Sequence, residues 1–132
     1  MYVLFRDDMI SSEEIAKEIE SNSQFLVETD LTKATKREDV MSFKLSIDVS
    51  NLTDEIFSWD NEALVDECFS KAESMTKEFL KFFPKYTVQA SEAYKWDDIE
   101  NKIYLVVVIA NIDITLKKLQ LDILKRMMKQ VD

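Results

Sequence analysis

The chain has 132 residues, of which 46% are hydrophobic and 33% are charged, and its net charge is −9, so we expect an acidic globular protein. The absence of glycine and histidine excludes a P-loop, a dinucleotide-binding fingerprint, a nucleophile elbow, a Ser-His-Asp triad and a histidine zinc site. The longest nearly uninterrupted apolar run, 103–110, is far shorter than the ~20 residues that a helix needs to cross a bilayer.

The start of the chain and its single cysteine favour a cytoplasmic protein. Residues 1–10 place acids directly after a very short apolar run, without the basic segment or the cleavage site of an export signal. Cys68 is the only cysteine, which excludes an internal disulfide and suits a reducing compartment. No linker or repeat interrupts the sequence, so residues 1–132 are predicted to form a single domain.

The first part of the chain predicts a strand, a helix and a second strand. Residues 2–5 indicate a short strand. Residues 10–20 indicate a helix that begins at a capping box made by Ser11 and Glu14. Residues 24–31 are predicted to form the next strand.

The middle of the chain predicts a strand followed by a long helix. Residues 40–50 alternate between apolar and polar side chains, which is typical of a strand with one face in the core and the other in water. Residues 65–83 carry apolar side chains at helical spacing, and Pro84 ends that helix. Residues 53–60 form either a separate first helix or the start of this one.

The last part of the chain predicts two strands and a helix. The strands cover 86–95 and 102–115, and the first half of the second strand is apolar on both faces, which places it centrally in a sheet. The helix, 116–131, carries more apolar residues than packing against one sheet requires. The order is β-α-β-β-α-β-β-α, an α+β fold of two layers with a mixed or mainly antiparallel sheet and its helices on one face. After the first strand, this order resembles that of type III secretion chaperones, which are small, acidic and dimeric.

The charges are unevenly placed along the sequence. Residues 1–116 hold 12 Lys/Arg and 24 Asp/Glu, whereas 117–132 hold five cations and two acids. An acidic body repels nucleic-acid phosphates and anionic membranes, so we expect neither as a direct partner. A protein with a basic surface is the partner that this charge favours.

Two sets of residues are candidates for contact with partners. Trp96 stands beside Asp97 and Asp98 in a polar loop, where a tryptophan can anchor a partner, and Trp59 has a similar but less exposed setting. In the last helix, a second apolar stripe is formed by Leu121, Leu124 and Met128. This stripe indicates either a homodimer or partner interface or a helix that lies deep in its own core.

The enzyme-like patterns are weaker. Glu100 and Lys102 have the spacing of the acid and lysine in the PD-(D/E)xK metal-dependent nucleases, which they resemble, but the Pro-Asp pair of those enzymes is missing. The paired acids lack EF-hand spacing, and Cys68 falls on the apolar face of a helix like a small core residue. We therefore predict no catalytic residue, no metal ligand and no cofactor.

These observations lead to one leading functional hypothesis and two alternatives. The first is a non-enzymatic regulator or inhibitor, of the kind that phages and mobile elements encode, whose acidic surface binds a nucleic-acid-binding protein. The second is a dimeric secretion or assembly chaperone that pairs through its last helix. The third is a metal-dependent, nuclease-like hydrolase that uses Glu100 and Lys102.

Overall fold

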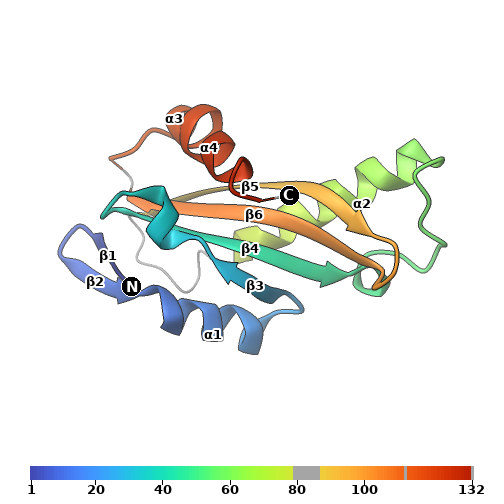
Figure 1. Cartoon of the computed structure of the whole chain (residues 1–132), viewed down its shortest axis with the longest axis horizontal. Coiled ribbons are helices and arrows are strands. Elements are labelled where there is room, and N and C mark those ends of the chain that lie inside the picture. The colour runs from blue at the N-terminus through green and yellow to red at the C-terminus, as the bar shows by residue number, and fades with distance from the viewer. Residues whose placement is uncertain (79–86, 112, 132) are drawn as a thin grey trace.

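A four-stranded antiparallel sheet forms the centre of the molecule, and a separate hairpin lies beside it (Figure 1). The computed structural model describes residues 1–78, 87–111 and 113–131. The strands of the sheet lie in the order β3 (Leu26–Asp30), β4 (Val40–Asp48), β6 (Lys102–Asn111) and β5 (Thr87–Asp97). The hairpin consists of β1 (Tyr2–Phe5) and β2 (Asp8–Ser11). The predicted α+β class and mainly antiparallel sheet are confirmed.

Helices cover both faces of the sheet. They are α1 (Ser12–Asn22), α2 (Glu62–Met75) and a C-terminal helix made of α3 (Leu116–Lys118), the π-helical turn η4 (Leu119–Ile123) and α4 (Leu124–Met128), with short 3₁₀ turns at η1 (Thr32–Thr35) and η2 (Val49–Asn51). One apolar cluster joins α1 and α2 to the face that carries Phe43 and Leu105. A second cluster joins the C-terminal helix to Val106 and Val108 on the opposite face.

The prediction of two layers with all helices on one face was therefore wrong for the C-terminal helix. Val106 and Val108 on one face of β6 are fully buried, and so are Leu105 and Val107 on the other. A central strand that is apolar on both faces must be covered on both, so the last helix packs opposite α1 and α2. The apolar residues on both faces of β6, which predicted its central place in the sheet, also require a third layer.

The polar face of β4 is more buried than its sequence suggested. Ser42 and Ser46 are fully buried, although this face was predicted to contact water. The Ser42 hydroxyl donates a hydrogen bond of 3.0 Å to the carbonyl oxygen of Val107, and the Ser46 hydroxyl donates one of 2.6 Å to the Glu28 carboxylate. Because both hydroxyls keep a partner, they can be buried without the cost of an unpaired polar group.

Helix α2 begins at Glu62, after the segment 53–60 that the sequence left open as a separate helix or as the start of this one. The side chain of Asn61 accepts a hydrogen bond of 3.2 Å from the backbone N–H of Leu64 and caps the helix. Residues 53–60 belong to an irregular loop and to neither of the two helices considered for them. The predicted end of this helix, at 79–83 and Pro84, lies outside the described residues.

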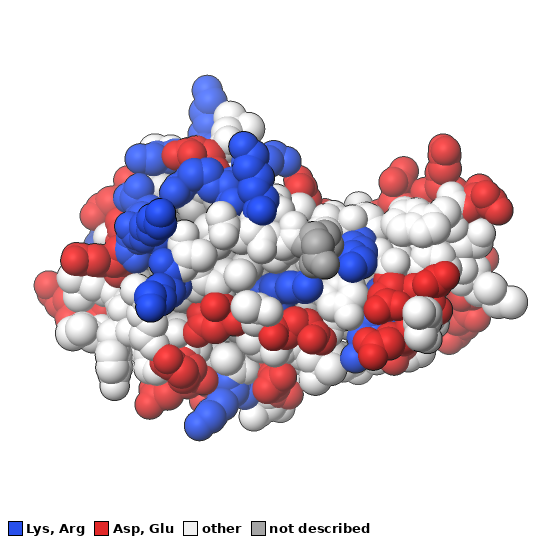
Figure 2. Space-filling view, in the orientation of Figure 1, with Lys and Arg blue, Asp and Glu red and all other residues white. Residues whose placement is uncertain are grey.

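The charged side chains are segregated over the surface (Figure 2). In that view, acidic side chains gather at the right-hand end, which holds the β5–β6 turn and the start of α2. Basic side chains gather at the upper left, over the C-terminal helix. The right-hand end and the surface over the C-terminal helix therefore carry opposite charge in this view.

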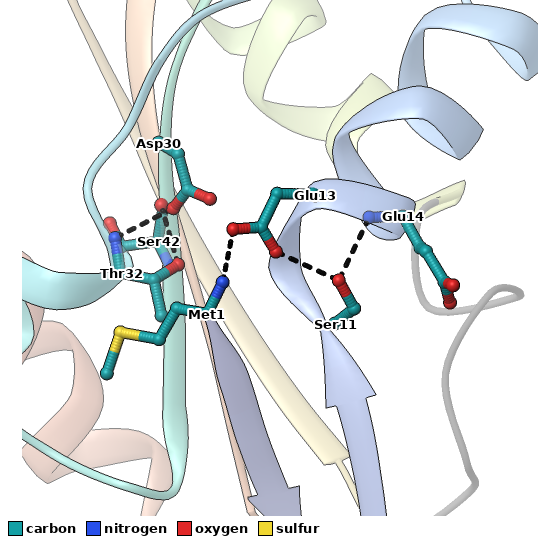
Figure 3. A network of polar contacts seen from close by, with 7 residues as sticks. All are labelled: Met1, Ser11, Glu13, Glu14, Asp30, Thr32 and Ser42. Atoms are coloured by element: carbon teal, nitrogen blue, oxygen red, sulfur yellow. Dashed lines mark hydrogen bonds and ion pairs between the residues drawn. The ribbon is translucent and has the colours of Figure 1, made fainter.

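A network of polar contacts joins the start of β1 to the start of α1 (Figure 3). The amino group of Met1 forms an ion pair with the carboxylate of Glu13. The Ser11 hydroxyl donates a hydrogen bond of 2.9 Å to the same carboxylate and accepts one of 3.4 Å from the backbone N–H of Glu14. The predicted capping role of Ser11 is confirmed, and the carboxylate that its hydroxyl contacts is that of Glu13.

These contacts predict a pH dependence at the start of α1. They lower the pKa of Glu13 from 4.5 to about 2, chiefly through the hydrogen bond from the Met1 amino group, then through a backbone hydrogen bond and the bond from Ser11. A folded-state pKa below the unfolded one means that the contribution of Glu13 to stability is present above pH 4.5 and is lost as the pH falls toward 2.

An NMR titration that follows the Glu13 carboxyl carbon is expected to give a midpoint near pH 2. Acetylation of the amino terminus removes the positive charge, so it is expected to move the midpoint upward. A midpoint near 4.5 in the unmodified protein would contradict the ion pair.

Candidate protein-binding surface

The β5–β6 turn and the loop at 52–61 meet at one end of the molecule, on the right in Figure 1. The backbone N–H of Val49, just before this loop, donates a hydrogen bond of 3.0 Å to the carbonyl oxygen of Asn101 in the turn. We call this region the aromatic end, defined by Ile56, Phe57, Trp59, Phe69, Trp96 and Ile99. Two segments that are distant in sequence thus build one surface.

A β-bulge in β5 decides where Trp96 points. Ala93 pairs with Leu105 and Trp96 pairs with Ile103, so the register shifts between Ala93 and Lys95. Strict alternation from Ala93 would have placed Lys95, and not Trp96, toward α2. The extra residue of the bulge rotates Trp96 onto the core face, where it packs against the cluster beneath α1 and α2.

Asn101 holds both the turn and the indole ring. Its φ of 58° lies in the left-handed region, a conformation that asparagine tolerates better than most residues and that this chain, without glycine, must assign to another residue type. Its side-chain oxygen accepts a hydrogen bond of 3.1 Å from Nε1 of Trp96. The turn and the tryptophan are therefore held by one side chain.

Four aromatic rings pack against one another at this end. The ring centres of Phe57 and Trp96 are 4.7 Å apart, and those of Trp59 and Trp96 are 5.7 Å apart. Trp59 also meets Phe69 edge to face at 6.0 Å. Edge-to-face and tilted contacts at these distances are favourable beyond the area they bury, so the rings form a rigid platform.

Large apolar side chains project from this platform into solvent. Ile56 is 91% exposed, Ile99 is 92% exposed and Trp59 is 50% exposed. Beside them lies a hollow of about 470 Å³, whose lining includes Ile56, Phe57 and Trp96. The acidic side chains of this end include Asp54, Glu55, Asp60, Glu62, Asp66, Asp97, Asp98 and Glu100. The surface combines apolar anchors with a negatively charged surround, as the right-hand end of Figure 2 shows.

The predicted anchor residues lie here, but in different roles. Trp96 is only partly exposed, and Oδ1 of Asp97 accepts hydrogen bonds from the backbone N–H groups of Ile99, at 3.0 Å, and Glu100, at 3.2 Å. Asp98 is exposed. Trp59, ranked second by sequence, is the more exposed tryptophan. The sequence patterns did not lead us to predict Ile56 or Ile99 as contact residues. Ile99 could have been recognised, because it is an isolated isoleucine between acidic residues.

The predicted self-association stripe does not form one exposed surface. Leu124 is 4% exposed and belongs to the core beneath the C-terminal helix, and Met128 is partly buried against the same core. Leu121 is exposed. The π-helical turn explains this pattern: Leu124 donates its backbone N–H to the carbonyl oxygen of Leu119, five residues back, so one extra residue is accommodated and two adjacent residues, Ile123 and Leu124, both reach the core.

The enzyme-like residues are not assembled into a site. Glu100 and Lys102 form an ion pair of 3.8 Å at the β5–β6 turn. Within residues 1–78, 87–111 and 113–131, no three His, Cys, Asp or Glu side chains come together as a metal-binding group. Burial raises the pKa of the buried Cys68 thiol, and the nearby Glu67 raises it further, which opposes formation of a reactive thiolate.

Comparison with known proteins adds no relative. No family model, no curated protein and no solved structure matches the chain. Among the helices in the described part of the chain, none is long and apolar enough to cross a membrane. The functional argument therefore depends on the surface itself.

Proposed function

We propose that the protein is a non-enzymatic regulator or inhibitor that binds the basic surface of a nucleic-acid-binding protein through its aromatic end. The observation that carries the proposal is the exposure of Ile56, Trp59 and Ile99 within an acidic surround. A monomeric protein rarely leaves large apolar side chains grouped in this way unless a partner covers them.

The two components of this surface have different tasks in the proposed complex. The acids attract a basic surface over a distance and accelerate association, an effect that salt weakens. The tryptophan and isoleucines lose water on contact and supply most of the affinity, as central aromatic and aliphatic anchors do at other interfaces. The surface with which a nucleic-acid-binding protein holds nucleic acid is basic as well. A protein that binds this surface therefore prevents nucleic acid from binding there.

The proposal is tested by affinity capture of the tagged protein from a lysate of its native source, with washes at low and high salt and identification by mass spectrometry. We expect one nucleic-acid-binding protein in stoichiometric amount, with a smaller yield after the high-salt wash. A partner without nucleic-acid-binding activity, or recovery of the tagged protein alone, would contradict the proposal.

A further inference from the structure

A second charged surface lies at the opposite end of the molecule from the aromatic end (Figure 2). We call it the basic patch, and its members are Lys33, Lys36, Lys117, Lys118, Lys125, Arg126 and Lys129, all of them exposed. They come from η1 and its C-cap and from the C-terminal helix. The patch is unexpected in a protein whose net charge is −9.

Packing brings the two segments of the patch together. Leu31 and Ala34, in and beside η1, join the apolar cluster that includes Leu119 and Met127 of the C-terminal helix. The charge of Asp122 in that helix contributes to the raised pKa of Arg37, after the larger effect of Asp39, so this guanidinium also lies near the helix. The cations are therefore concentrated on one surface by the tertiary structure.

Two exposed leucines lie among these cations. Leu116 is 48% exposed and Leu121 is 64% exposed, and both belong to the C-terminal helix. Lys117 and Lys118 follow the first of them directly. A ligand made of phosphate groups would contact the cations and leave these leucines in water. A protein segment with acidic and apolar side chains would contact both the cations and the leucines.

The rest of the molecule also argues against a long polyanion. Charges on a surface act over a Debye length of about 8 Å at physiological ionic strength. A short acidic segment can lie wholly within the patch, but a nucleic acid that runs past it meets the acids of the remaining surface and is repelled. The charge pattern therefore favours a compact acidic partner.

We propose that the basic patch binds a short acidic segment of another protein, with glutamate or aspartate side chains on the lysines and apolar side chains on Leu116 and Leu121. This surface is separate from the aromatic end, so the protein can bridge a basic partner and an acidic one. Lys125 and Arg126 already pair with Glu92 at 2.7 Å and Asp122 at 3.4 Å, which makes Lys117 and Lys118 the better cations to change.

The test uses fluorescence anisotropy of a short labelled peptide composed of glutamate and leucine. The variant Lys117→Ala/Lys118→Ala is compared with Lys17→Ala/Lys71→Ala, which removes two exposed lysines outside the patch and gives the same net charge. We expect the first variant to weaken binding about three- to tenfold and the second to leave it nearly unchanged. Leu121→Ser is expected to weaken binding of this peptide but not of an all-glutamate peptide.

Three results would overturn the proposal. They are no binding of the glutamate-leucine peptide to the unaltered protein, an equal loss in both double-lysine variants, and tighter binding of single-stranded DNA than of the peptide. Thermal unfolding of each variant checks that these surface changes leave the fold intact. The peptide assay uses the purified protein without any partner of the aromatic end, so its result is independent of the fate of the proposed function.

Discussion

Replacing Ile103 by alanine is expected to lower the free energy of unfolding by about 2–5 kcal/mol. Ile103 is 0% exposed at the start of β6, where it pairs with Ile47 of β4 on one side and Trp96 of β5 on the other. The change removes apolar contacts and leaves a cavity between two strands and α2 that close packing cannot easily fill. The aromatic end would lose the support beneath Trp96.

The matched control is Ile99→Ala, the same chemical change a few residues earlier in the β5–β6 turn. Ile99 is 92% exposed, so its truncation is expected to alter the free energy of unfolding by less than about 0.5 kcal/mol. Urea unfolding followed by circular dichroism measures both variants. Equal effects of the two changes would mean that Ile103 is not in the core or that Ile99 is not free of it.

Trp59→Ala is expected to weaken the complex with the captured partner by about 2 kcal/mol, or roughly 30-fold in Kd. Trp59 is half exposed and held edge to face by Phe69 and Trp96, so it presents a rigid apolar ring at little conformational cost. Truncation removes the largest anchor of the surface and leaves the surrounding acids in place. Dissociation is therefore expected to accelerate more than association slows.

Tyr2→Ala is the control for this second prediction. Tyr2 is an exposed aromatic residue, at 65%, but it lies in β1, outside the aromatic end. Biolayer interferometry with the purified partner measures both variants, and their melting temperatures confirm that each is folded. If Tyr2→Ala weakened binding as much as Trp59→Ala, the interface would not be the aromatic end.

Local sequence patterns correctly predicted those elements whose conformation depends on residues that are neighbours in the chain. The alternation over 40–50 correctly predicted β4, and the helix-start signal at Ser11 correctly predicted the cap of α1. Both depend on neighbours in the chain: a strand exposes alternate side chains to opposite faces, and a cap needs only a side-chain oxygen near the first free N–H groups. The start of α2 was harder to predict, because residues that cap helices occur both within 53–60 and at Asn61.

The sequence alone determined the α+β class, the central place of β6 in the sheet and the classes of site that a chain without glycine and histidine cannot build. Tertiary structure alone decided which residues form a surface. The bulge in β5 turned Trp96 inward, packing on both faces of β6 drew Leu124 into the core, and contact between η1 and the C-terminal helix gathered the basic patch. These outcomes depend on the register between strands and on the covering of apolar faces by segments that are distant in the sequence. No local pattern of residues can therefore predict them.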